Sequence, residues 1–147
     1  SFTGASKRLE LFADSPGKRI YRDFAHAPSK VQATTQAVRD QFPNDLFLAC
    51  LELHTFSSLD SDFIFTYAKC LEHTDIAVVF IDGGASKAKG KDPLDVDTIR
   101  NAFDNKSLHV FYSKEILLKW INQQPASILL MMSSGNFGGL DLHSLID

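Results

Sequence analysis

The chain has 147 residues, of which 44% are hydrophobic and 22% are charged, and its formal net charge is -3. This length and composition suit a single domain with a real hydrophobic core. The sequence carries no basic stripe or cluster, so nucleic acid is not an expected partner. It also has no apolar run long enough to cross a bilayer and no recognisable signal peptide. We therefore expect a cytoplasmic protein with no membrane partner.

Short β-rich runs are spread along the chain. The first two span residues 7–13 and 17–25, and the second is introduced by the turn signal Ser15-Pro16-Gly17. The later runs are almost continuously apolar, as is typical of strands buried on both faces of a parallel sheet. These later runs are Leu46–Leu53, Ile76–Ile81, Leu108–Tyr112 and Ser127–Met132.

The segments between these runs have apolar residues at helical spacing. The periodic positions are Val31, Thr35, Val38 and Phe42, then Leu59, Phe63, Tyr67 and Cys70, then Val96, Ile99 and Phe103, then Ile116, Leu117, Trp120 and Ile121. Capping-box-like starts occur at Ser29–Gln32 and Ser57–Asp60, and Ser113 can cap the last helix. Alternating strands and helices predict an α/β fold. We expect a three-layer Rossmann-like sandwich of about six strands, mostly parallel with one antiparallel edge strand.

The sequence does not predict a zinc site or a phosphate-binding loop, because the residues that could form them lack the required spacing. Cys50 and Cys70 lie in apolar runs, and with the five histidines they form no zinc-like spacing, so we expect reduced, buried thiols and no metal site. The polar stretch Gly83–Lys91 is not a phosphate-binding loop. Its glycines, Gly84 and Gly90, are separated by five residues rather than four, and Asp92 replaces the required Ser or Thr.

Ligands bind open parallel sheets beyond the carboxyl ends of the strands, and three unusual loops are expected there. The first, "DFAHAPS", places Asp23 and His26 between a strand and a helix N-terminus, where an anion can be held. An ordinary turn, in which both side chains bond to loop backbone, explains this stretch more simply.

The second and third loops follow later strands. In "HTFSS", Ser57 is most simply a helix N-cap, whereas His54 is either a ligand contact or a packed loop residue. "MMSSGNFGGLD" (Met131–Asp141) combines two serines and three glycines with an aromatic residue, and glycine allows close backbone approach to a ligand. This loop is the strongest local indication of a binding site. The alternative is an irregular turn into a short C-terminal helix.

Together these segments resemble the C-terminal domain of the Mur ligases, the ATP-dependent enzymes that build the peptidoglycan stem peptide. "GASKRLE" (Gly4–Glu10) is similar to the family's hinge segment, and Asp23–Thr34 is similar to its D-[YF]-x-H-x-P motif. "ELHTFSS" (Glu52–Ser58) resembles the P-H-T-Y-S-R segment of the alanine-adding member. Met131–Asp141 resembles the M-S-N-G-x-F-G-G-[IL]-H segment of the muropeptide ligase. The resemblance covers essentially the whole chain, in order.

This resemblance implies a hinge segment and first short strand in residues 1–17, and the C-terminal α/β domain in residues 18–147. The N-terminal and central domains of the same chain would hold UDP-N-acetylmuramic acid, and ATP with Mg²⁺. The muramyl carboxyl group would become an acyl phosphate, and an incoming amine would attack it to form an amide. The C-terminal domain would close over ATP and bring in the amino acid or stem peptide. The chain alone is therefore expected to be inactive.

The resemblance also implies roles for particular residues. Arg8 matches the hinge arginine near the reacting phosphate or carboxylate, Asp23 the aspartate that holds the nucleotide ribose, and His26 the motif histidine on the nucleotide side. Contact with the incoming substrate is implied for His54, Ser133, Ser134 and Asn136.

Three positions depart from the family pattern. Lys7 replaces a first arginine, Ala27 replaces a second His or Thr, and Ser58 replaces the arginine of the alanine-adding member. The last change, with the glycine-rich loop, favours L-alanyl-γ-D-glutamyl-meso-diaminopimelate as the incoming substrate, with single L-alanine as the alternative. A free-standing nucleotide- or peptide-binding module and a structural domain with no site are the other interpretations.

Overall fold

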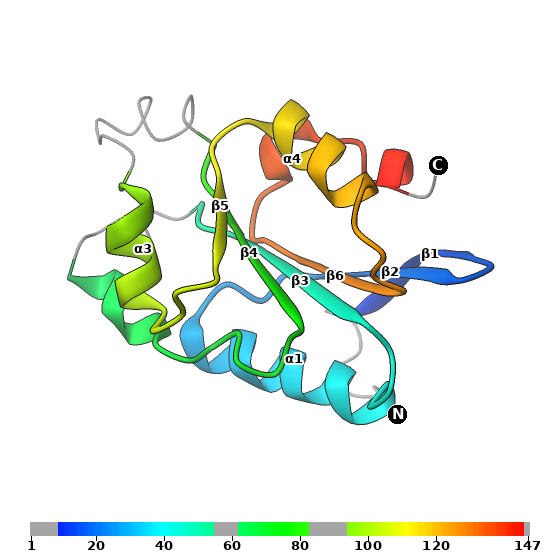
Figure 1. Cartoon of the computed structure of the whole chain (residues 1–147), viewed down its shortest axis with the longest axis horizontal. Coiled ribbons are helices and arrows are strands. Elements are labelled where there is room, and N and C mark those ends of the chain that lie inside the picture. The colour runs from blue at the N-terminus through cyan, green and yellow to red at the C-terminus, as the bar shows by residue number, and fades with distance from the viewer. Residues whose placement is uncertain (1–8, 55–61, 83–93, 146–147) are drawn as a thin grey trace.

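The computed structural model describes residues 9–54, 62–82 and 94–145. They form a six-stranded sheet in the order β1-β2-β6-β3-β4-β5, with β1 antiparallel to β2 and all other neighbours parallel (Figure 1). This confirms the predicted α/β fold with one antiparallel edge strand. The strands are β1 (Glu10–Ser15), β2 (Lys18–Asp23), β3 (Phe47–Glu52), β4 (Ile76–Phe80), β5 (His109–Phe111) and β6 (Ile128–Met132).

Helices cover both faces of this sheet. They are α1 (Pro28–Gln41), α3 (Val96–Ala102) and α4 (Lys114–Asn122), with the 3-10 turns η2 (Phe63–Tyr67), η3 (Phe137–Gly139) and η4 (Leu142–Leu145). In Figure 1, α1 and α3 lie on one side of the sheet, and α4 lies on the other with the C-terminal turns. Successive residues of β3 alternate between two separate hydrophobic clusters, one on each face. The predicted three-layer sandwich is therefore confirmed.

The second segment predicted as a helix differs from the prediction in its helix type. Within the described residues it is the 3-10 turn η2 and not an α-helix; Leu59 lies outside those residues. The buried positions Ile64, Tyr67 and Cys70 recur every third residue, which is the period of a 3-10 turn. Tyr67 stacks on Phe103 of the α3 side with 5.2 Å between ring centroids, and this packing holds the short turn in place.

The start of α1 also differs from the prediction. Its N-cap is Ala27, with no side-chain capping bond, and Pro28 takes the first helical turn. Proline fits there because the missing N–H has no intrahelical partner in any case. The capping box expected at Ser29 is therefore wrong. Ser113 does cap α4, accepting a bond from Ile116 N–H at 3.4 Å, and Ser57 lies outside the described residues.

Two further expectations concern the cysteines and the membrane. Cys50 and Cys70 are both free and buried, as predicted. In the described ranges, every helix is too short or too polar to cross a bilayer.

Candidate functional site at the carboxyl edge of the sheet

Buried polar side chains collect where neighbouring parallel strands end. Asp23 ends β2, Glu52 ends β3, and Ser133 directly follows β6. Because these strands are adjacent and parallel in the order β2-β6-β3, their carboxyl ends meet at one edge of the sheet. The three residues are only 2%, 1% and 4% exposed, respectively. The edge therefore carries a row of polar groups that the fold shields from solvent.

Asp23 has one oxygen paired and one oxygen unpaired. Its Oδ2 atom accepts a 2.8 Å hydrogen bond from Thr34 Oγ1 of α1. Its Oδ1 atom is buried and has no hydrogen-bond partner among the described residues. A buried acceptor left unsatisfied costs about 1–3 kcal/mol, and more when it is charged. Such an atom needs a donor from beyond the described residues, which marks Asp23 as a candidate ligand contact.

A pocket of about 290 Å³ lies directly beside Asp23. One wall comes from β1, β2 and Phe24, which directly follows β2 and is 57% exposed. The other wall comes from the loop after β6. Aromatic surface combined with a few fixed polar groups suits a ligand that has a flat apolar part and hydrogen-bonding substituents. The lining residues are Phe12, Arg22, Asp23, Phe24, Ser133, Gly135, Asn136, Phe137, Leu140, Asp141 and Leu142.

Glu52 holds the loop after β6 in place through hydrogen bonds. The carboxylate Oε1 accepts hydrogen bonds from Ser133 Oγ–H and, at 2.9 Å, from Phe137 N–H. Ser133 Oγ in turn accepts from Gly135 N–H at 2.7 Å. The hydroxyl of Ser134 is buried and has no partner within the described part of the chain. The sequence interpretation assigned no role to Glu52. The available signal was an acidic residue inside the apolar run "LACLEL".

The glycines of this loop are explained by close contacts. A Cβ atom at Gly135 would lie 2.9 Å from the ring of His54, so the loop backbone packs directly on the imidazole. His54 Nδ1 is 3.8 Å from Glu52 Oε2. Gly138 has a φ of 66°, and a Cβ there would lie 3.0 Å from Asp82 Oδ2. Close approach favours glycine at Gly135, and close approach together with a positive φ favours it at Gly138.

The loop is also tied to the start of α4. Lys114 Nζ donates a 2.9 Å hydrogen bond to the carbonyl oxygen of Gly138. The loop continues through the 3-10 turns η3 and η4, as the alternative interpretation of an irregular turn into a short helix described. It is therefore a fixed structure that borders the Asp23 pocket.

The structure brings most of the sequence-predicted site residues to this edge. Asp23, Ser133 and Asn136 line the pocket, and Ser134 and His54 adjoin it through the loop. His26 is exposed and its Nδ1 lies 3.1 Å from the carbonyl oxygen of Phe24, which fits the simpler explanation of that turn. Arg8 lies outside the described residues. Contact between any of these residues and a ligand stays a prediction.

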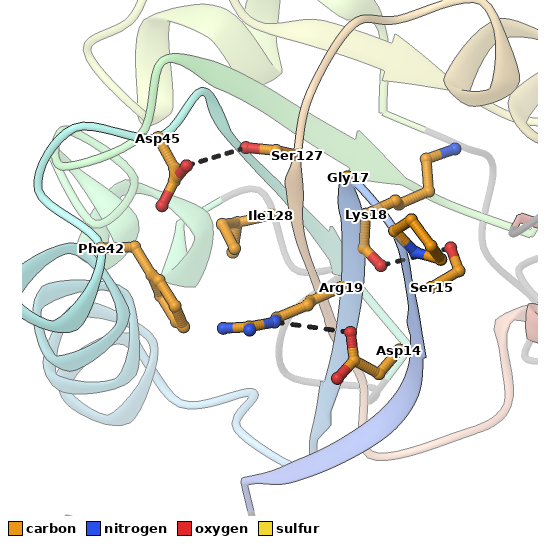
Figure 2. A pocket seen from close by; sticks show the side chains of 10 residues that line it. Asp14, Ser15, Gly17, Lys18, Arg19, Phe42, Asp45, Ser127 and Ile128 are labelled. Atoms are coloured by element: carbon orange, nitrogen blue, oxygen red, sulfur yellow. Dashed lines mark hydrogen bonds and ion pairs between the residues drawn. The ribbon is translucent and has the colours of Figure 1, made fainter.

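A larger cavity of about 500 Å³ lies at the opposite edge of the sheet (Figure 2). It is formed around the β1–β2 turn, and its charged groups already have partners. Arg19 pairs with Asp14 at 3.4 Å, and Asp45 accepts from Ser127 Oγ at 3.4 Å. It lies away from the buried polar row, so we place the candidate site at the carboxyl edge. Among the described residues, no group of three His, Cys, Asp or Glu could hold a metal ion.

Comparison with known proteins identifies relatives along most of the chain, although no family model matches it. The chain is 25% identical over 138 residues to a UDP-N-acetylmuramate–L-alanine ligase from Flavobacterium psychrophilum, covering 94% of the chain and 30% of that protein. It is 30% identical over 150 residues to the ligase of the same name from Chlorobium luteolum, covering 92% of the chain and 31% of that protein. The chain therefore spans about a third of the length of these relatives.

Two solved structures share the fold. A murein peptide ligase from Psychrobacter arcticus superposes with a TM-score of 0.71 at 21% identity, covering 94% of this chain and 29% of that one. A domain named as part of a UDP-N-acetylmuramate:L-alanyl-γ-D-glutamyl-meso-diaminopimelate ligase from Haemophilus ducreyi gives a TM-score of 0.67 at 27% identity. The second match covers 95% of this chain and 98% of that domain, so the two correspond almost end to end.

Proposed function

We propose that this chain, whose relatives and structural neighbours are Mur ligase C-terminal domains, closes over ATP in a longer UDP-N-acetylmuramate ligase and positions the incoming amine. In the proposed reaction, ATP transfers its γ-phosphoryl group to the muramyl carboxylate and leaves as ADP. The amine then attacks the acyl phosphate, an amide forms and phosphate departs. Closure suits this chemistry, since an acyl phosphate must be kept from water.

Asp23 carries the proposal. Its buried Oδ1 atom, which no described residue pairs, lies beside the pocket and is a ready acceptor for a ribose hydroxyl, and a carboxylate retains further acceptor capacity on Oδ2. The nearby exposed ring of Phe24 adds flat apolar surface. The neutral part of the nucleotide is therefore assigned to this chain. The phosphates and Mg²⁺ are assigned mainly to the central domain, and the UDP-sugar to the N-terminal domain, of the same cytoplasmic protein.

The remaining residues take the roles that the motifs imply. Arg8 is assigned to the reacting phosphate or carboxylate, where a guanidinium can bind two oxygens at once. His26 is assigned to the nucleotide side. The incoming substrate is assigned to His54, Ser133, Ser134 and Asn136.

The proposed incoming substrate is L-alanyl-γ-D-glutamyl-meso-diaminopimelate. The near end-to-end match with the Haemophilus ducreyi domain supports a peptide-adding enzyme. Single L-alanine is the second candidate, because both sequence relatives described above are named L-alanine ligases.

The test is amide formation by the full-length protein that carries this chain. Purified protein is given ATP, Mg²⁺ and UDP-N-acetylmuramic acid with either L-alanine or the tripeptide, and the UDP product is identified by mass. We expect the tripeptide product at the higher kcat/KM. A higher kcat/KM with L-alanine reverses the substrate assignment. No amide with either amine overturns the ligase proposal and favours a free-standing binding module. The isolated chain should give no turnover in the same assay.

The role of Asp23 has its own test. Asp23→Asn in the full-length protein should raise the KM for ATP about tenfold or more, because a charged hydrogen bond to the nucleotide is weakened. Asp97→Asn, at the exposed start of α3, is the matched control and should leave that KM unchanged. An unaltered KM for ATP in Asp23→Asn would remove the assignment.

A further inference from the structure

The buried carboxylate of Glu52 has no part in the roles assigned above. It ends β3, between β6 and β4 in the sheet, and is 1% exposed. A buried carboxylate is unfavourable unless hydrogen bonds satisfy it. Here the donors come from a distant part of the chain, Ser133 Oγ–H and Phe137 N–H, both to Oε1. The carboxylate and the loop after β6 therefore stabilise each other.

The loop needs this support because its backbone is unfavourable. Phe137 has a φ of 55°, in the left-handed region that residues other than glycine rarely adopt. A phenylalanine stays in that region only where its surroundings hold it. Two contacts do so: its N–H is bonded to Glu52, and its ring is 3% exposed and packs near Phe80 with 6.3 Å between centroids.

The residues held in this way are those that border the pocket. Glu52 is not part of the pocket lining, but Ser133, Gly135 and Asn136 are. On its other side, Glu52 Oε2 lies 3.8 Å from His54 Nδ1, so one carboxylate adjoins both loops assigned to the incoming substrate. We infer that Glu52 is a positioning residue that fixes Asn136 and His54 in place for the incoming amine. This inference rests on the proposed function for its substrate.

Kinetics of the full-length protein test the inference. Glu52→Ala removes the acceptor, whereas the amide oxygen of Glu52→Gln can still accept from Ser133 and Phe137. We expect Glu52→Ala to raise the KM for the amine about tenfold or more and the KM for ATP by a smaller factor, because Asp23 and Phe24 belong to the other wall of the pocket. Glu52→Gln should recover most of the loss. The matched control is Glu72→Ala, which alters an exposed glutamate away from the pocket.

Two kinetic outcomes would overturn the inference. One is an unchanged KM for the amine in Glu52→Ala. The other is an equal rise in both KM values, because this means that the whole edge of the sheet, and not the loop alone, has been disturbed.

Hydrogen exchange gives a readout that does not depend on activity. In Glu52→Ala, the amides of Gly135 and Phe137 should exchange about tenfold faster or more, while those of β3 and β6 keep their protection. Glu52→Gln should behave like wild type. Failure of the wild-type protein to form amide would remove the proposed function but not this loop result. Unchanged protection of the loop in Glu52→Ala would overturn the positioning role, whatever the activity.

Discussion

Thr34 in α1 donates a 2.8 Å hydrogen bond to Oδ2 of Asp23, and this bond joins the helix to the end of β2. It fixes the carboxylate, while Oδ1 has no partner in the part of the chain that the structure describes. Thr34→Val keeps the side-chain shape and removes the donor, so the carboxylate can rotate. We expect the KM for ATP to rise about three- to tenfold in the full-length protein, less than for Asp23→Asn.

The control for this change is Thr66→Val in η2, where the hydroxyl donates to the carbonyl oxygen of Phe63. It should leave the KM for ATP at the wild-type value. A Thr34→Val protein with normal ATP kinetics would show that Asp23 does not need this bond to stay oriented.

Asp75 makes the stability of this chain depend on pH. Burial alone would raise its pKa, but a 2.7 Å hydrogen bond from Arg39 and a 2.8 Å bond from Phe47 N–H outweigh burial and hold the pKa below its ordinary value. A carboxylate whose pKa is lower in the folded state stabilises the fold at pH values above its unfolded pKa of about 3.9. This stabilisation is lost as the pH falls through the folded pKa. The wild-type chain should therefore lose this contribution in acid.

Asp75→Asn should cost about 1 kcal/mol at neutral pH, since the carboxylate is partly exposed and screened by water. Urea unfolding at pH 7 and pH 3 measures this. The gap between wild type and variant should narrow at the lower pH. Asp40→Asn, on the exposed side of α1, is the control and should leave the free energy of unfolding at pH 7 within about 0.5 kcal/mol of wild type. A gap of constant size would contradict the assigned role of Asp75.

Alanine substitutions at Gly138 and Gly17 distinguish the cost of backbone strain from the cost of a steric contact. Both have positive φ values, 66° and 80°, so alanine at either site should cost about 1–2 kcal/mol. Only at Gly138 would the new Cβ lie 3.0 Å from Asp82 Oδ2, whereas nothing lies within 4 Å at Gly17. Urea unfolding should therefore show a loss about 1 kcal/mol greater for Gly138→Ala. Equal losses would mean that Asp82 moves aside freely.

The strands of the sheet could be predicted because each one forms from a run of apolar residues that are consecutive in the sequence. Leu46–Leu53 and Ser127–Met132 are almost continuously apolar, and they form the central strands β3 and β6 with both faces buried. Parallel order then places the loops that follow these strands at one edge, so the gathering of Asp23 and Ser133 followed from the fold class.

The remaining features depend on contacts between distant residues. Glu52 is bonded to Ser133, 81 positions away, and nothing near Glu52 in the sequence indicates that partner. Before the structure is known, the acid only interrupts an apolar run. The start of α1 was mispredicted for a local reason, because two neighbouring residues carry the same kind of signal. Both Pro28 and Ser29 favour a helix N-terminus, and the proline took the first turn.

The two cysteines should resist alkylation in the folded protein. Burial raises the pKa of Cys50 well above its ordinary value and that of Cys70 to about 11. Because the thiolate is the reactive form, both react only when the chain opens. Brief iodoacetamide treatment at pH 8, followed by peptide mapping, should label neither cysteine in native protein and both in guanidinium. An added exposed cysteine, Thr66→Cys, should react at once and so validates the reagent. Rapid native labelling of Cys70 would show that the turn after η2, which Thr35 and Pro28 of α1 contact at Cys70, opens readily.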